Sequence, residues 1–306
     1  MDFKRTISMK SMEKVILFFE KCIFTLYGLV KILMNTRFIQ KKEIPKTKDE
    51  FCYILGTGPS LRKDFLERNV YVDIENLIAV NNFVCSEWYD KIKPKFYVLA
   101  DPAYYVDNLD QQLQMNIHNL FVELKEKTNW PLILFVPFEG KKRIRELLKA
   151  NGHISVVGYN KVNTWKGFKW FDRWVYNNQW AIVSGLNVVM AALSLSINMG
   201  FKKIYLFGVD HSWHKNLVMR DDNTLCWYYS HFYDEKDNEN LELIPVYLEE
   251  NNQIKCLKMH ELLDSMGKAF QVYHFIENYA KHKKIKIYNC TSNSFIDAFE
   301  RKDLNK

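Results

Sequence analysis

The stretch FCYILGTGPSL, residues 51–61, has the pattern of a buried strand that ends in a glycine-rich turn. Phe51–Leu55 is an uninterrupted apolar run of strand length, and Gly-Thr-Gly-Pro-Ser breaks it. Short apolar runs without polar alternation are typical of parallel sheets that are covered on both faces. The stretch therefore predicts the first strand of an α/β fold, with a loop at its carboxyl end.

The rest of the chain repeats this alternation of strand and helix. Five further apolar runs are expected to be buried strands: Leu77–Val80, Phe96–Ala100, Leu132–Val136, Ile204–Phe207 and Ile285–Tyr288. Three segments between them have helical patterns: Lys142–Ala150, Leu186–Met199 and Glu261–His282. This order predicts a Rossmann-like, mainly parallel sheet with helices on both faces. Residues 215–258 are polar and irregular, so we expect a long lid, about 212–260, between the last two strands.

Composition limits the class of protein. The chain has 306 residues, of which 48% are hydrophobic, so it can bury a full core. Its net charge of +7 is too small to indicate nucleic acid as a partner, but it suits an anionic substrate or an anionic membrane surface. The six cysteines show no zinc-site spacing, so we expect no metal site and a reducing, cytoplasmic location.

Residues 1–45 differ from the 46–306 domain that follows. Their apolar runs are interrupted by Glu20, Lys21 and Lys31, whereas a membrane-spanning helix needs about 20 predominantly apolar residues. A basic amphipathic helix lying on the inner face of the plasma membrane would account for both features. A helix that packs on the protein's own core or in a homo-oligomer is an equal alternative.

The glycine-rich turn is the first candidate binding site. Backbone N–H groups of such a turn can approach a phosphate closely, and a following helix adds partial positive charge. The motif is neither a Walker A loop nor a complete GxGxxG, so a structural tight turn is the alternative. The candidate nucleotide-binding residues here are Gly56, Thr57, Gly58, Pro59 and Ser60.

Polar residues at other strand ends are expected to face the same crevice, because ligands of parallel sheets bind beyond the carboxyl ends of the strands. For each of them the alternative is a turn, capping or loop-anchoring role. These candidates are Asn81 and Asn82, Asp101, Ser184 and Gly185 before an apolar helix, and Asp210.

Four blocks of this sequence, taken together and in order, resemble a known superfamily. The blocks are ILGTGPSL (54–61), AVNNF (79–83), SGLNVVMAALSLSINMGFKKIYLFGVD (184–210) and KIKIYNCTSNSFIDAF (284–299). They are similar to the bacterial sialyltransferases of glycosyltransferase family 42, and more so to the domain shared by Maf flagellin glycosyltransferases and MptE-like pterin diphosphokinases. The resemblance implies a Rossmann-like fold and, for the transferases, an inverting, metal-independent reaction with a CMP-activated nonulosonic acid.

The resemblance also implies roles for single residues. Asn81 and the pair Ser184-Gly185 match donor-binding positions, whereas Thr57 stands where the sialyltransferases have Asn. Asp210-His211-Ser212-Trp213 replaces their phosphate-binding Tyr segment. Their catalytic base is a His after the lid, which His260 matches best.

His231 is the competing candidate for this base, and Asp210 is the candidate if neither histidine serves; His211 and His214 do not match the position. Imidazole suits proton removal from an acceptor hydroxyl near neutral pH.

The sequence thus predicts transfer of a sugar from a nucleotide donor to a surface glycan or glycolipid, without a cofactor. One alternative is ATP-dependent diphosphate transfer to a hydroxymethylpterin-like substrate, with Mg²⁺ held by Asp101 and Asp210. Another is a non-catalytic nucleotide-binding module in surface-polysaccharide assembly. Two local features stay open: the Trp-rich segment 165–180 suits sugar stacking or a core, and 220–223 suits a solvated turn rather than a metal site.

Overall fold

The computed structural model describes residues 2–38, 43–68, 74–107, 109, 111–228, 243–250 and 253–303. At its centre lies a sheet of eight strands in the order β13-β12-β6-β1-β2-β3-β4-β5. Every neighbouring pair in this sheet is parallel. The strands are β1 (Phe51–Leu55), β2 (Leu77–Val80), β3 (Phe96–Val98), β4 (Leu132–Pro137), β5 (Ile154–Tyr159), β6 (Lys203–Phe207), β12 (Lys286–Asn289) and β13 (Glu300–Arg301).

The order in which the strands are added to the sheet reverses beside β1. The strands β1 to β5 follow one another outward, and β6 then returns to pair with the other side of β1. Tyr53 of β1 is accordingly in register with Leu77 of β2 and with Tyr205 of β6. In open α/β sheets such a switch point opens a crevice at the carboxyl ends of the strands.

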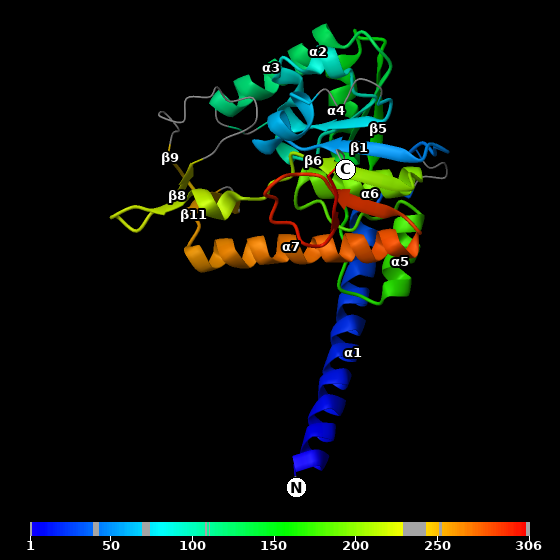
Figure 1. Cartoon of the computed structure of the whole chain (residues 1–306), viewed down its shortest axis with the longest axis vertical. Coiled ribbons are helices and arrows are strands. Elements are labelled where there is room, and N and C mark those ends of the chain that lie inside the picture. The colour runs from blue at the N-terminus through cyan, green and yellow to red at the C-terminus, as the bar shows by residue number, and fades with distance from the viewer. Residues whose placement is uncertain are drawn as a thin grey trace.

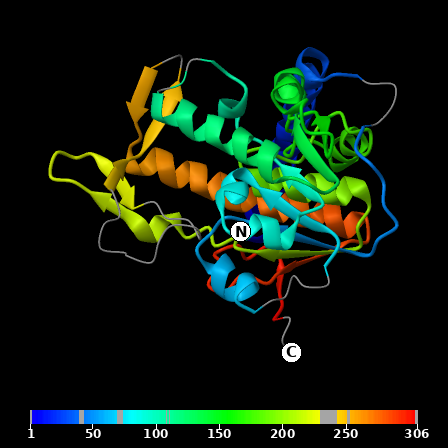
Figure 2. The ribbon, with the colours of Figure 1, turned by 90° about the horizontal axis from the view of Figure 1, so that it is seen from above.

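Helices cover both faces of this sheet, as predicted (Figures 1 and 2). Alternate strand residues point to opposite faces: Ile54 belongs to one core cluster and Leu55 to the other. The Ile54 side carries α5 (Lys169–Asn177), α6 (Val188–Met199) and α7 (Met259–His282). The Leu55 side carries α2 (Tyr89–Ile92), α3 (Gln111–Lys127) and α4 (Phe138–Leu148).

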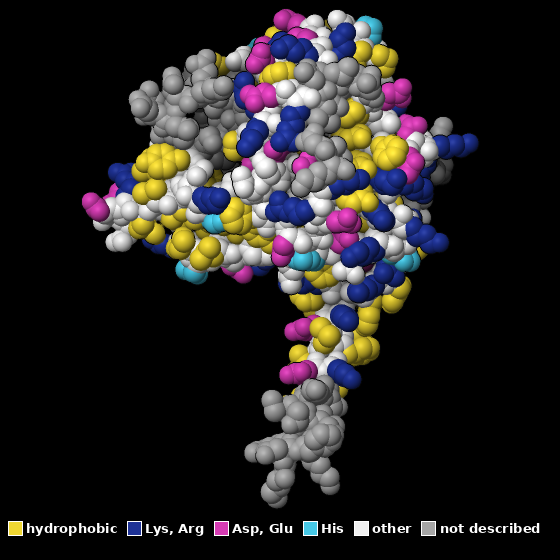
Figure 3. Space-filling view, viewed as in Figure 1, with side chains coloured by type: hydrophobic (Ala, Val, Ile, Leu, Met, Phe, Trp, Pro, Cys, Tyr) yellow, Lys and Arg dark blue, Asp and Glu magenta, His cyan; other side chains and the backbone are white. Residues whose placement is uncertain are grey.

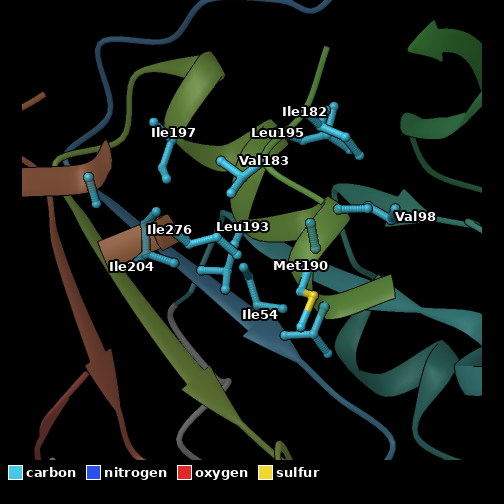
Figure 4. Close-up of a cluster of buried hydrophobic side chains, with 14 of the residues drawn as sticks. Ile54, Val98, Ile182, Val183, Met190, Leu193, Leu195, Ile197, Ile204 and Ile276 are labelled. Atoms are coloured by element: carbon cyan, nitrogen blue, oxygen red, sulfur yellow. The ribbon is translucent and has the colours of Figure 1, made fainter. Parts of the chain in front are cut away.

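The helix α6 lies deepest in the molecule. All of its residues are buried, and Met190 and Leu193 pack beside Ile54 and Ile204 of the sheet (Figure 4). A helix with apolar residues on every side is stable only inside a protein or a membrane, and its buried Ser194 and Ser196 hydroxyls donate to its own backbone carbonyls, so its burial follows from its sequence. The Rossmann-like fold class is therefore confirmed, although β5, β13, α3 and α5 were not anticipated.

The segment expected to be an irregular lid contains regular strands. A short 3-10 helix, Trp213–Asn216, precedes an antiparallel sheet of β7 (Leu217–Met219), β8 (Leu225–Tyr228) and β9 (Leu243–Pro245), and β10 (Tyr247–Glu250) pairs with β11 (Gln253–Cys256). Leu225 and Val246 form a small core with Leu262 and Met266 of α7, and this core packs β8 and Val246 against that helix. Residues 220–223 form the β7–β8 turn, as expected, with Asn223 at φ 60°.

The first helix, α1 (Asp2–Asn35), joins the domain only at its C-terminal part and otherwise projects from it (Figure 1). Gly28 lies against Thr164 and Phe171, and Ile32 is buried in the core. The Lys31 ammonium donates a hydrogen bond to Asn163 Oδ1 at 3.1 Å. Within the described residues, no helix combines the length and apolarity that crossing a membrane requires.

Candidate functional site

A cavity of about 350 Å³ opens at the carboxyl edge of the sheet, beside the switch point between β1 and β6. It brings together residues that follow five strands, β1, β2, β3, β5 and β6, with residues from the start of α6 and from the segment after Asp210. Seven of the residues expected from the sequence line it: Thr57, Gly58, Pro59, Asn81, Asp101, Gly185 and Asp210. The lid segment contributes Trp213, Asn216, Trp227 and Tyr228.

The glycine-rich turn does not offer its amides to a phosphate in the way we expected. Gly56 N donates to Phe207 O at 2.8 Å, and Gly58 N donates to Gly208 O at 2.9 Å. Beyond the turn comes a five-residue π-helix, Arg62–Leu66, rather than a long α-helix. The amides of Gly56 and Gly58 are therefore already bonded within the protein, and nucleotide binding by the rest of this turn stays a prediction.

Gly56 and Gly58 are needed because the turn after β1 lies very close to the loop after β6. A Cβ on Gly56 would overlap Gly208 O, and a Cβ on Gly58 would overlap Asp210 Oδ2. The Ser60 hydroxyl, which lies outside the cavity lining, donates to the same Oδ2 at 2.8 Å. The turn therefore fastens β1 to the loop after β6 and shapes one wall of the cavity.

The Asn81 side chain carries a buried oxygen that has no hydrogen-bond partner in the described structure, and this residue lines the cavity. It adopts a left-handed conformation at φ 49°, and its carbonyl accepts a hydrogen bond from the Tyr97 hydroxyl at 2.5 Å. Its side-chain Oδ1 is buried and has no hydrogen-bond partner in the described structure. Buried polar atoms are normally satisfied, so this oxygen indicates a missing ligand or water. Asn82 follows in a 3-10 helix and does not line the cavity.

The start of α6 forms another wall of the cavity. Its N-cap is Asn187, whose Oδ1 accepts from Met190 N at 3.0 Å. Ser184, for which helix capping was the alternative to nucleotide binding, is fully buried outside the cavity lining, and its Oγ accepts from Leu186 N at 3.1 Å. It orders the turn that precedes the helix, and its neighbour Gly185 lines the cavity.

Lys161 places a cation at the cavity, and no sequence pattern had indicated it. Its side chain passes Gly185, and its Nζ donates to Ala100 O at 2.6 Å. Burial lowers the pKa of Lys161, while nearby Asp101 acts in the opposite direction. The Asp101 carboxylate is exposed and accepts from Ala103 N at 2.9 Å, so it caps a short 3-10 helix at the cavity edge.

Asp210 and His211 are the buried titratable groups of the cavity. Burial raises the pKa of Asp210, and hydrogen bonds from Ser60 oppose that rise. His211 Nε2 lies 2.6 Å from the Tyr273 hydroxyl and 3.3 Å from Asn187 Nδ2. Burial lowers the pKa of His211 to about 3, so its imidazole is neutral at pH 7.

The two histidines favoured from the sequence lie elsewhere. His260 is exposed at the start of α7 and is not part of the cavity lining. That helix start is built as a capping box, with Lys258 N donating to Glu261 Oε2 at 2.9 Å, so nothing turns His260 inward. The role as base predicted for it is not supported by this position. His231 lies outside the described residues.

The described part of the chain contains no group of three or more His, Cys, Asp or Glu that could hold a metal ion. Asp101 and Asp210, the two carboxylates that an Mg²⁺-dependent reaction would use, both line the cavity.

Comparisons with known proteins identify the family. The model of the family described as 6-hydroxymethylpterin diphosphokinase MptE-like matches residues 30–216, which is more than half of the chain. No curated protein sequence matches significantly. Among solved structures, the MAf glycosyltransferase from Magnetospirillum magneticum AMB-1 is similar, with a TM-score of 0.47 and 15% identity over 90% of this chain. The present chain covers 37% of that protein's length. The resemblance to sialyltransferases stays a prediction.

Proposed function

The chain belongs to the 6-hydroxymethylpterin diphosphokinase MptE-like family, and we propose that its cavity binds the nucleotide of an activated donor and transfers a group from it to an acceptor hydroxyl. The observation that carries this proposal is the convergence of three features in one cavity. These are the N-terminus of α6, the Lys161 ammonium and the unpartnered Oδ1 of Asn81.

The donor phosphate is assigned to the wall formed by α6 and Lys161. The first amides of a helix lack partners within the helix, and together with the helix dipole they favour an anion. Val188 and Val189 open α6 and line the cavity, and the Lys161 side chain runs past Gly185 just before them. The glycine-rich turn has a different part in this scheme, because its amides at Gly56 and Gly58 are already bonded. It excludes water from the far side of the donor.

The base or ribose of the nucleotide is assigned to Asn81. A carboxamide oxygen accepts hydrogen bonds from an exocyclic amine or a hydroxyl, and that of Asn81 has no other partner in the described structure. Binding would therefore satisfy an atom that is costly to leave buried and unbonded.

Our first candidate reaction is glycosyl transfer from a nucleotide sugar, with a CMP-linked nonulosonic acid as the expected donor and a surface glycan or glycolipid as acceptor. Trp213, Trp227 and Tyr228 line the cavity, and their flat rings suit the C–H faces of a sugar. The acceptor oxygen would attack the anomeric carbon while the bond to the phosphate oxygen breaks. Asp210 would take the acceptor proton, because its pKa is raised toward the working range of a general base.

The family description favours a second candidate, diphosphate transfer from ATP to a hydroxymethylpterin-like substrate. Asp101 and Asp210 line the cavity and would hold the Mg²⁺ that neutralises the triphosphate. The flat rings of the lid segment would then stack on a pterin instead of a sugar.

A transfer assay distinguishes the two candidates. The full chain is incubated with CMP-, UDP- or GDP-linked sugars plus a glycan mixture, or with ATP, Mg²⁺ and a hydroxymethylpterin. Release of the free nucleoside phosphate from a sugar donor supports the first candidate, and AMP formation that depends on the pterin supports the second. Neither product from any pair would leave a non-catalytic nucleotide-binding module, the third possibility raised by the sequence.

A further inference from the structure

A second cavity, of about 410 Å³, lies on the other side of the molecule from the lid, where α1 meets α5 and α7. Its walls are largely apolar, with Phe24 of α1, Tyr176 of α5 and Phe275 of α7 among them. Neither the proposed reaction nor the predicted nucleotide-binding residues use this cavity. We therefore consider it as a second candidate binding site.

Four cations surround this cavity, and we call them the cation cluster: Lys21, Lys166, Lys169 and Arg173. None of them forms an ion pair within the described structure, although fourteen such pairs occur elsewhere in it. The Lys166 ammonium lies over the Phe24 ring at 5.3 Å and over the Trp165 ring at 4.7 Å, so it is held beside α1. Unpaired cations at the mouth of an apolar cavity favour an anion that carries apolar chains.

A buried carboxyl group adds a second polar requirement to the ligand. Asp172 lines the same cavity and is only 7% exposed, and its Oδ1 has no hydrogen-bond partner within the described structure. A hydroxyl group on the ligand would satisfy this oxygen. The cavity thus fits a head group that combines an anionic phosphate with a hydroxyl.

The other side of α1 presents an apolar surface, which we call the outer face. With about 100° of rotation per residue, the charged residues Lys14, Glu20, Lys21 and Lys31 fall on the side that meets the domain. By the same rotation, the opposite side carries exposed apolar residues, with Leu26 at 64% and Met34 at 77% exposure. Figure 3 shows apolar side chains, with charged ones beside them, on the projecting part of the helix. The outer face consists of Ile16, Phe19, Ile23, Leu26, Val30, Leu33 and Met34.

Aromatic residues continue the outer face onto the domain. Phe38, just after α1, contacts Trp180, and Trp180 contacts Trp174 of α5. Trp170, one turn before Trp174, is 67% exposed. Tryptophan at the edge of an apolar surface, with lysine and arginine beside it, is typical of proteins that lie in the membrane interface.

We propose that the outer face of α1 and the exposed tryptophans of α5 dock on an anionic phospholipid bilayer, with a phosphate- and hydroxyl-bearing head group held between α1 and α5 by the cation cluster and Asp172. A helix is about 10 Å across, so when its outer face lies among the acyl chains its domain side lies at the level of the lipid phosphates. The outer face spans about 100° of the helix circumference, and its residues from Ile16 to Leu33 alternate in spacings of three and four, as the seam of a two-helix coiled coil also does. The unpaired cations at the cavity and the exposed Trp170 and Trp174 of α5 beside the outer face favour an anionic membrane over a second copy of the chain.

The proposal is tested by sedimentation of the full chain with vesicles of phosphatidylcholine alone or mixed with phosphatidylglycerol. We expect binding to the mixed vesicles, much weaker binding to phosphatidylcholine alone, and weakening by salt. Lys169→Glu with Arg173→Glu should lower the partition coefficient at least tenfold, at about fivefold for each cation lost near an anionic surface. Ile23→Asp with Leu26→Asp should abolish binding to both vesicles.

The matched control is Lys142→Glu with Arg145→Glu, which makes the same charge change on exposed positions of α4, across the sheet. This variant should bind nearly as the unmodified chain does. An equal loss of vesicle binding in the control variant would overturn the proposal that the cation cluster and Asp172 bind the head group. Equal binding of the unmodified chain to both kinds of vesicle would overturn it as well.

Two alternatives to a membrane are distinguished by further measurements: a second copy of the chain on the outer face, and free phosphate at the cation cluster. If the outer face pairs two chains, sedimentation velocity without vesicles will show a dimer that Ile23→Asp with Leu26→Asp dissociates, and vesicles will not bind. If the cation cluster holds only free phosphate, inorganic phosphate will raise the melting temperature of the chain while vesicles again fail to bind. Either result overturns the proposal, and neither bears on nucleotide binding in the first cavity.

Discussion

The Ser60 hydroxyl donates a hydrogen bond of 2.8 Å to Asp210 Oδ2, across 150 residues of sequence. This bond joins the turn after β1 to the loop after β6 at the switch point of the sheet. It also holds Asp210 at the cavity wall, where burial raises its pKa. The hydrogen bond therefore couples the stability of the fold to the proton affinity of the proposed general base.

Gly58→Ala should destabilise the protein as well as the site. The new Cβ would overlap Asp210 Oδ2 and lie 2.7 Å from Gly208 O, which is backbone and cannot move aside easily. We expect the free energy of unfolding to fall by about 1–3 kcal/mol, the usual cost of overpacking. Urea unfolding measures it. Gly267→Ala on the open face of α7 is the control, and it should stabilise by about 0.5–1 kcal/mol. Equal stability of the two variants would show that the loops separate freely.

Asp210→Asn should lower turnover by about two to four orders of magnitude, the range for loss of a general base. His260→Ala should leave turnover within a few-fold, because His260 is exposed and outside the cavity. The rate of donor cleavage in the presence of acceptor is the measurement. A severe loss in His260→Ala with near-normal Asp210→Asn would restore the role first expected for His260.

His211 should make the protein less stable as the pH falls. Its folded pKa of about 3 lies below the unfolded value of 6.5, so the unfolded chain binds the proton more strongly. The contribution of His211 is present above pH 6.5 and is lost as the pH falls toward 3. His211→Asn tolerates the φ of 51° and should reduce this loss. Unfolding free energies at pH 7 and pH 5 test it, and an unchanged difference between them would contradict the buried, neutral imidazole.

Asp172 should act in the opposite direction. Burial raises its folded pKa to about 6 from 3.8, so its contribution is present below pH 3.8 and is lost as the pH rises to about 6. Asp172→Asn should therefore be more stable than the unmodified chain at pH 7, by at most about 3 kcal/mol. The gain should shrink at pH 4.5, as urea unfolding at the two pH values would show. A gain that does not depend on pH would mean that the carboxyl is not protonated in the folded state.

Much of the fold could be predicted because its strands are short, apolar and buried on both faces. Phe51–Leu55 and Leu77–Val80 match β1 and β2 to the residue. The strand β5 was missed because half of Ile154–Tyr159 is only partly buried, which weakens the apolar signal. Exposed polar faces hid α3 in the same way.

The candidate site could be predicted where residues follow predicted strands, as Asn81 and Asp210 do. Lys161 follows the missed β5, so no pattern placed it at the cavity. His211 and Asn187 were set aside or overlooked because their partner, Tyr273, is distant in sequence. Hydrogen bonds of the Gly56 and Gly58 amides depend on the approach of two loops, which sequence spacing does not reveal.

The central claim, that the first cavity binds a nucleotide through Asn81 and Lys161, is tested most directly by thermal denaturation with CMP, CDP, UDP, GDP and ATP, each with Mg²⁺ or EDTA. A ligand that binds only the folded chain raises its melting temperature. When the free ligand concentration is a hundredfold above Kd, the free energy of unfolding rises by about 2.7 kcal/mol. We predict that at least one nucleotide, CMP or CDP first, stabilises the full chain, and that Asn81→Ala and Lys161→Gln each weaken this shift while Lys142→Gln does not. Stabilisation by ATP only with Mg²⁺ would select the diphosphokinase candidate at the same site. No shift with any nucleotide, or a shift that both cavity variants retain in full, would contradict the account.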